Sequence, residues 1–144
     1  MSPSQAGHEI GERKIGRSVL ALMAGFFATV LLSLGTDFLM HAIGFFPEIG
    51  QPMGSDRLAV ATAYRTLYSV LSSYIVARLA PYKPMGHAML GGCIGVVLGA
   101  AGAAATWNRN FGPHWYPIAL IVIAMPTAWA GGELRVLQSR RAPE

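Results

Sequence analysis

Four long runs of apolar residues, each bounded by turn-forming or charged residues, dominate the pattern of this chain. They cover about residues 18–43, 57–80, 86–107 and 116–134. Each run is close to the ~20 residues that an α-helix needs to cross a bilayer. Prolines between the runs, such as Pro47, Pro81 and Pro84, end the helices. The pattern predicts an all-α membrane protein, an up-down bundle of four transmembrane helices.

Polar segments precede and follow the apolar runs. Residues 1–17 contain Pro3, several glycines and a terminal basic cluster, and are expected to form a polar mobile tail. Residues 135–144 are expected to form a basic C-terminal tail, which leaves residues 18–134 as one transmembrane domain. The first run resembles a signal peptide, but it is longer than a usual h-region and no A-x-A-like cleavage site follows. It is therefore expected to remain as the first transmembrane helix.

The composition supports a membrane location. Hydrophobic residues make up 53% of the chain and charged residues 12%, and the mean hydropathy is +0.42, whereas soluble chains average about 25% charged residues. The net charge of +4 does not indicate nucleic-acid binding, because the basic residues flank apolar runs instead of lining one face. The single cysteine, Cys93, excludes a dithiol-disulfide oxidoreductase and argues against structural zinc.

The distribution of Lys and Arg predicts the orientation. The two tails and the turn after the second run carry eight of these residues, the opposite side carries Arg57 and Arg109, and Arg65 lies within a run. Because positive residues favour the cytoplasmic side, both termini are expected in the cytoplasm. The compact layout suits a bacterial cytoplasmic (inner) membrane.

Ionisable residues within the apolar runs are the main candidates for function, because such residues are costly in a membrane. Asp37 and His41 share one helical stripe with Ser33 and Thr36. Arg65 lies in the second run. At 1.5 Å per residue, Asp37 and Arg65 are both expected on the order of 10 Å below the outer boundary, at a depth where they can pair.

Three interpretations of this pair remain open. It can fix the pairing of the first two helices, contact a separate subunit, or line an outward-facing polar pocket. The residues proposed for that pocket or ion pair are Asp37, His41, Tyr64, Arg65 and His114. Asp37 and His41 could also offer two metal ligands on one helix face, with Glu48 and His114 as further donors. Two ligands at one spacing are common by chance, so no metal, cofactor or catalytic residue is predicted.

The third run contains a series of glycines at spacings of four, four and three residues. Such small-residue stripes let membrane helices approach closely. The glycines of this stripe are expected either to pack inside the bundle or to associate with another chain. They are Gly91, Gly95, Gly99 and Gly102.

These features favour an accessory or scaffold subunit of a membrane complex over a catalytic protein. The alternatives are an oligomeric transporter of small solutes or ions and, third, a membrane enzyme acting on a lipid headgroup. In length and layout the chain resembles small four-helix exporters, but those carry an unpaired membrane-embedded Glu, whereas Arg65 can mask Asp37 here. The expected partners are the lipid bilayer and further copies or a larger membrane complex, not nucleic acid.

Overall fold

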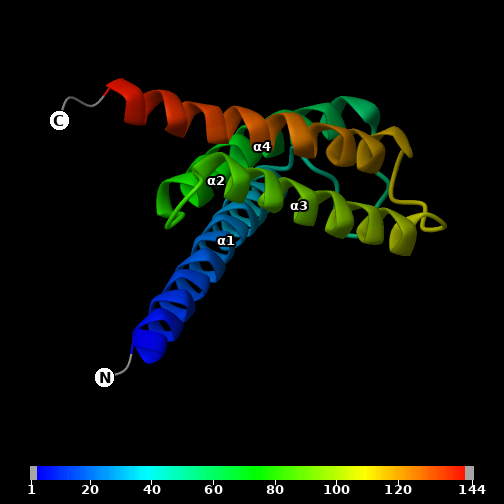
Figure 1. The fold of residues 1–144 in the computed structure, drawn as a ribbon. Coiled ribbons are helices and arrows are strands. Elements are labelled where there is room, and N and C mark those ends of the chain that lie inside the picture. The colour runs from blue at the N-terminus through cyan, green and yellow to red at the C-terminus, as the bar shows by residue number, and fades with distance from the viewer. Residues whose placement is uncertain (1–2, 142–144) are drawn as a thin grey trace.

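The computed structural model describes residues 3–141, with side chains from residue 14 onward, and this part of the chain is entirely helical without strands. It contains four helices, shown in Figure 1: α1 (Pro3–Ala42), α2 (Ser55–Leu79), α3 (Pro84–Thr106) and α4 (Trp115–Arg141). Their order and cores agree with the four apolar runs of the sequence.

Three of these helices are long and apolar enough to cross a membrane. The spans are Lys14–Ala42 in α1, all of α3 (Pro84–Thr106), and α4 (Trp115–Arg141). They are compatible with a small integral membrane protein. Helix α2 is less apolar, because it carries Asp56, Arg57, Arg65 and Arg78 within its 25 residues.

Two helices extend beyond the ends expected from the sequence. Helix α1 begins at Pro3, where a tail up to residue 17 was expected, and α4 continues to Arg141 beyond the expected end at residue 134. Proline is compatible with the first turn of a helix, and adding a residue to an existing helix is far easier than nucleating one. The expected tail residues 1–2 and 142–144 lie outside the described residues.

The helices form two antiparallel hairpins. In the first, the Ser72 hydroxyl of α2 donates to the Gly25 carbonyl of α1 at 2.6 Å, and Thr36 lies 2.8 Å from the Tyr68 hydroxyl. In the second, α3 and α4 run antiparallel side by side. Helices α2 and α4 also pack on one another and join the hairpins, as Figure 1 shows.

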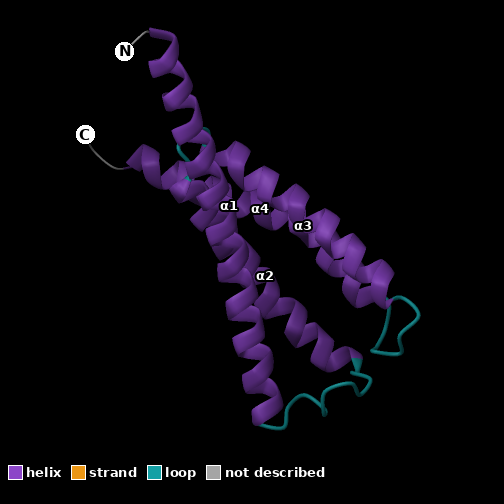
Figure 2. Cartoon of the chain, turned by 90° about the horizontal axis from the view of Figure 1, so that it is seen from below, coloured by secondary structure: helices purple, strands orange, loops and turns teal. Residues whose placement is uncertain are grey.

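The hairpins converge near the chain termini and diverge toward the loops 43–54 and 107–114, which Figure 2 shows in teal. At the converging end the buried His87 of α3 lies 2.9 Å from the Ser18 hydroxyl of α1. Gly91 faces Leu22 of α1 nearby. The divergence leaves space among the four helices at the loop end.

Glycines hold the converging end together by allowing backbones to approach closely. Gly131 and Gly132 are adjacent on α4 but face different helices. A Cβ on Gly131 would lie 2.6 Å from Ser73 Cβ of α2, and one on Gly132 would lie 3.0 Å from Ala88 Cβ of α3. Helix α4 is therefore packed tightly between α2 and α3 at this level.

Candidate functional site

Asp37 is the centre of a hydrogen-bonded cluster between α1 and α2. One Nη atom of Arg65 donates to Asp37 Oδ2 at 2.5 Å, and the Tyr64 hydroxyl donates to the other carboxylate oxygen, Oδ1. Both charged side chains keep partial exposure, 23% for Asp37 and 30% for Arg65. The carboxylate is thus neutralised and hydrogen-bonded on both oxygens while remaining accessible from one side.

The contact arises from the polar stripe of α1. Asp37 and Thr36 both face α2, where Thr36 contacts the Tyr68 hydroxyl. About two helical turns closer to the termini end, Thr29 donates to the Tyr68 carbonyl at 3.4 Å. Tyr64 and Tyr68 are one turn apart on α2, and their rings contact each other in a tilted arrangement along the same seam. Of the polar stripe, Thr36 and Asp37 are hydrogen-bonded to α2, whereas His41 is bonded within α1.

Arg65 also reaches α4. Its guanidinium carbon lies 5.8 Å from the centre of the Tyr116 ring, within the range of a cation–π contact. Its Nε is buried and has no hydrogen-bond partner. The guanidinium therefore links α1, α2 and α4 and retains one unused donor.

The two candidate histidines lie apart from the Asp37 carboxylate. His41 Nδ1 is 2.7 Å from the backbone carbonyl of Asp37, and His114 Nε2 is 3.0 Å from the carbonyl of Trp107. Since a carbonyl only accepts hydrogen bonds, each of these ring nitrogens must carry the proton. In the neutral histidines the other ring nitrogen is an acceptor. Neither histidine is hydrogen-bonded to the Asp37 carboxylate.

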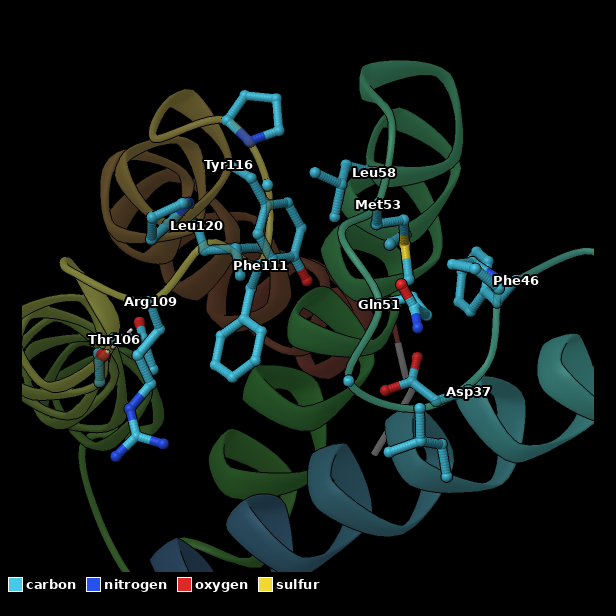
Figure 3. A pocket seen from close by; sticks show the side chains of 18 of the residues that line it. Asp37, Phe46, Gln51, Met53, Leu58, Thr106, Arg109, Phe111, Tyr116 and Leu120 are labelled. Carbon is cyan, nitrogen blue, oxygen red and sulfur yellow. Dashed lines mark hydrogen bonds between the residues drawn. The ribbon is translucent and has the colours of Figure 1, made fainter.

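A cavity of about 880 Å³ opens beside the ion pair, between the diverging hairpins. Figure 3 shows the Asp37 carboxylate of α1 and the Tyr116 hydroxyl of α4 pointing toward this space. Most of its wall is apolar and includes residues such as Leu34, Gly99 and Leu120. Polar side chains from the loops lie at its outer rim, namely Glu48, Gln51, Arg109 and His114.

The two loops meet above the cavity. The Met53 amide donates to the Phe111 carbonyl at 3.0 Å, and the Trp115 indole donates to the Ser55 hydroxyl at 3.3 Å. Gly112 fits against this contact with φ +152°, and a Cβ there would lie 2.9 Å from the Met53 carbonyl oxygen. These contacts connect the hairpins at the end where their helices diverge.

Tyr116, Phe111 and Arg109 are wall residues that the sequence interpretation missed. They belong to the segment Trp107–Pro117, whose many aromatic residues are typical of an interfacial belt. Tyr116 could have been found from its position just inside the fourth apolar run, at the same end of the bundle as Asp37 and Arg65. The helix pairing that brings it to Arg65 is not visible in the sequence.

The predicted glycine stripe lies partly against other helices of the same chain. A Cβ on Gly95 would lie 3.8 Å from Ala124 of α4, and a Cβ on Gly99 would lie 3.2 Å from Ile121 of the same helix. Gly91 faces α1, whereas Gly102 has no neighbour within 4 Å and lines the cavity. The closest approach on α3 is made by Gly92, which the spacing argument did not select and whose Cβ would lie 2.6 Å from Ala128 Cβ.

Metal ligation finds no geometric support among residues 14–141, where no group of three or more His, Cys, Asp and Glu side chains is gathered as a metal ion would need. Asp37 is engaged with Arg65, and His41 with a carbonyl. The site therefore consists of the ion pair, the polar atoms without partners and the cavity.

Searches of protein-family models, of curated proteins and of solved structures find no match to this chain, so the geometry alone carries the functional argument.

Proposed function

We propose that this chain is a four-helix integral membrane protein that binds an amphipathic molecule in the cavity between its hairpins. The observation that carries the proposal is the position of the Asp37–Arg65 pair on the wall of a mostly apolar cavity of about 880 Å³. Volumes of about 300–1,000 Å³ with few, well-placed polar groups are typical of ligand sites.

All four helices cross the bilayer in this proposal, with both termini in the cytoplasm of a bacterial cell. Helix α2 is less apolar than the other three helices, because its charged residues lower its hydropathy. Its 25 residues extend about 37 Å at 1.5 Å per residue, which is enough for the hydrocarbon core. Asp56, Arg57 and Arg78 lie in its first and last turns, at headgroup depth, and Arg65 is paired. The excess of Lys and Arg at the termini end supports the orientation.

The charges on the cavity wall indicate the kind of head group that fits. Asp37 and Glu48 are balanced by Arg65 and Arg109, so the wall carries no net charge when the histidines are neutral. The partly exposed Arg65 guanidinium offers N–H donors on its Nη atoms, and His41 Nε2 and His114 Nδ1 offer acceptors when these histidines are neutral. A neutral or zwitterionic head group with both donors and acceptors, attached to an apolar body, matches this wall.

Transport is the second candidate function. It is favoured by the partial exposure of the ion pair to a space that opens at one end of the bundle, as charged groups in transporters usually face a cavity. An accessory or scaffold role is less favoured than the sequence suggested, because Gly92, Gly95 and Gly99 of α3 already pack on α4. The enzyme hypothesis is less favoured because neither histidine is hydrogen-bonded to the Asp37 carboxylate; each is bonded to a backbone carbonyl instead.

A cavity-filling substitution tests the proposal. In Gly102→Leu the new side chain has no neighbour within 4 Å of its Cβ and occupies cavity space, whereas Gly35→Leu has equal freedom but lies outside the cavity wall. Native mass spectrometry of protein gently extracted from its membrane should show a bound molecule in the parent and in Gly35→Leu. That molecule should be lost from Gly102→Leu, and its mass would identify its class.

Retention of the same molecule in all three proteins would place it outside the cavity and reject the proposal. Loss from both variants would indicate a general effect of leucine on the helices and reject it as well. A transporter is distinguished by solute flux in vesicles, where Gly102→Leu should stop flux and Gly35→Leu should not.

A further inference from the structure

A second polar cluster lies at the opposite end of the molecule from the cavity, between the end of α2 and the last turns of α4. Arg78 Nη1 donates to the Tyr74 hydroxyl at 3.2 Å, and this hydroxyl donates to Gln138 Oε1 at 2.5 Å. Arg135 Nη1 donates to the same Gln138 oxygen at 3.4 Å. We refer to Tyr74, Arg78, Arg135 and Gln138 as the arginine cluster.

The arginine cluster holds two positive charges together through neutral groups. Each guanidinium has five N–H donors and uses one of them in these bonds. Among residues 14–141 the structure shows a single ion pair, Asp37–Arg65, so no carboxylate there neutralises either arginine of the cluster. Glu133 is two positions from Arg135 on α4, and side chains two residues apart do not face each other on a helix. An anion between the two guanidiniums would relieve their repulsion.

Exposed leucines neighbour members of the arginine cluster in the sequence. Leu79 follows Arg78 and is 44% exposed, and on α4 Leu134 and Leu137 are exposed as well. Exposed leucines next to paired guanidiniums suit a ligand with a negative head and hydrocarbon chains. Arg78 is in the last turn of α2, and Arg135 follows the fourth apolar run, so both fall at headgroup depth in a bilayer.

We infer that Arg78 and Arg135 bind the phosphate group of an anionic phospholipid in the leaflet on the side of the chain termini. Guanidinium groups match phosphate oxygens in planar, two-pronged hydrogen bonds. Tyr74 and Gln138 act as positioning residues, because their hydrogen bonds link the guanidiniums of α2 and α4. This site is separate from the cavity and does not depend on the ligand proposed there.

The test uses the full chain, delipidated in mild detergent, with three added probes: phosphatidylglycerol, phosphatidylcholine and inorganic phosphate. Native mass spectrometry should show at least five-fold more one-to-one adduct with phosphatidylglycerol than with phosphatidylcholine. Arg78→Gln/Arg135→Gln should remove this preference. The matched control Arg140→Gln/Arg141→Gln removes the same charge from exposed positions one to two turns further along α4, and should keep it.

The inference would be overturned if Arg78→Gln/Arg135→Gln retained as much phosphatidylglycerol as the parent. It would also be overturned if the control Arg140→Gln/Arg141→Gln lost as much as the cluster variant. Thermal melting separates the sources of the phosphate: stabilisation by phosphatidylglycerol alone supports a lipid, whereas equal stabilisation by inorganic phosphate would overturn the lipid assignment. If the glutamine variant fails to fold, Arg78→Lys/Arg135→Lys keeps the charge but lacks the two-pronged geometry. This lysine variant should form at least three-fold less phosphatidylglycerol adduct than the parent. An unchanged amount of adduct would contradict the paired-guanidinium site.

Discussion

Arg65 donates to the Asp37 carboxylate at 2.5 Å while its Nε atom remains buried without a partner. A purely structural ion pair is most stable when every donor and acceptor is satisfied, because an unsatisfied buried polar atom costs about 1–3 kcal/mol. Here the pair neutralises the charge, but the buried Nε stays unsatisfied. The arrangement holds two helices together, while the exposed part of the guanidinium faces the cavity.

Removal of either charge should destabilise the protein more than removal of both. Breaking a buried pair by one partner costs about 3–5 kcal/mol, and partial exposure reduces the expected cost at this site. Asp37→Asn and Arg65→Gln should each lower the melting temperature in detergent, and the double variant should recover part of the loss, with a coupling of about 1 kcal/mol or more. Additive losses would show that the two side chains do not stabilise each other.

Two tyrosines near the pair should respond differently to loss of the hydroxyl. Tyr64→Phe removes a donor from the Asp37 carboxylate and should lower stability by about 1.5–3 kcal/mol, the range for hydrogen bonds to charged groups. Tyr116→Phe removes a hydroxyl that points into the cavity and should weaken ligand retention with little change in melting temperature. Both variants remove one tyrosine hydroxyl. Equal changes in melting temperature and in ligand retention would contradict the roles assigned to Tyr64 and Tyr116.

A methyl group on Gly131 should disrupt the contact between α2 and α4. In Gly131→Ala the Cβ would lie 2.7 Å from the backbone nitrogen of Tyr74, and backbone cannot move aside as a flexible side chain can. Overpacking typically costs about 1–3 kcal/mol, so the melting temperature should fall clearly. Gly35→Ala places the same methyl group in open space and should be neutral or stabilising. A tolerated Gly131→Ala would mean that α4 packs differently on α2.

Cysteine labelling tests the proposed crossing of α2 and the orientation. In a Cys93→Ser background, Ile49→Cys lies in a loop where the native side chain is 91% exposed, and Ser139→Cys lies near the end of α4. A membrane-impermeant maleimide should label position 49 in intact cells lacking any outer barrier and position 139 after permeabilisation. Labelling of both positions from the same side would exclude a chain in which all four helices cross the membrane.

Much of the fold follows from the sequence because long apolar runs have few alternatives to helix. The prolines at 47, 81 and 84 and the loop prolines separate the four helices close to where the structure ends them. The outer ends of α1 and α4 were predicted less well, since polar, glycine-containing sequence gives no strong local signal while an adjoining helix can propagate into it.

The candidate site was only partly predictable. Depth along two consecutive helices is simple arithmetic, so Asp37 and Arg65 were expected at one level, and their side chains are in contact in the structure. The cavity depends on the angle between the hairpins, which in turn depends on the close approach of Gly131 of α4 to α2. Such angles are properties of paired surfaces, and a single sequence without its contacts does not specify them.

The adjacent glycines of α4 have a consequence for motion. Because Gly131 fits against α2 and Gly132 against α3, a turn of α4 about its own axis would push one of these faces into a neighbour. This restricts rotation of α4 at the junction, so a change in cavity width that preserves the junction is easiest at the loop end. Widening there would have to break the Met53–Phe111 hydrogen bond, and the distance between these two residues would report it.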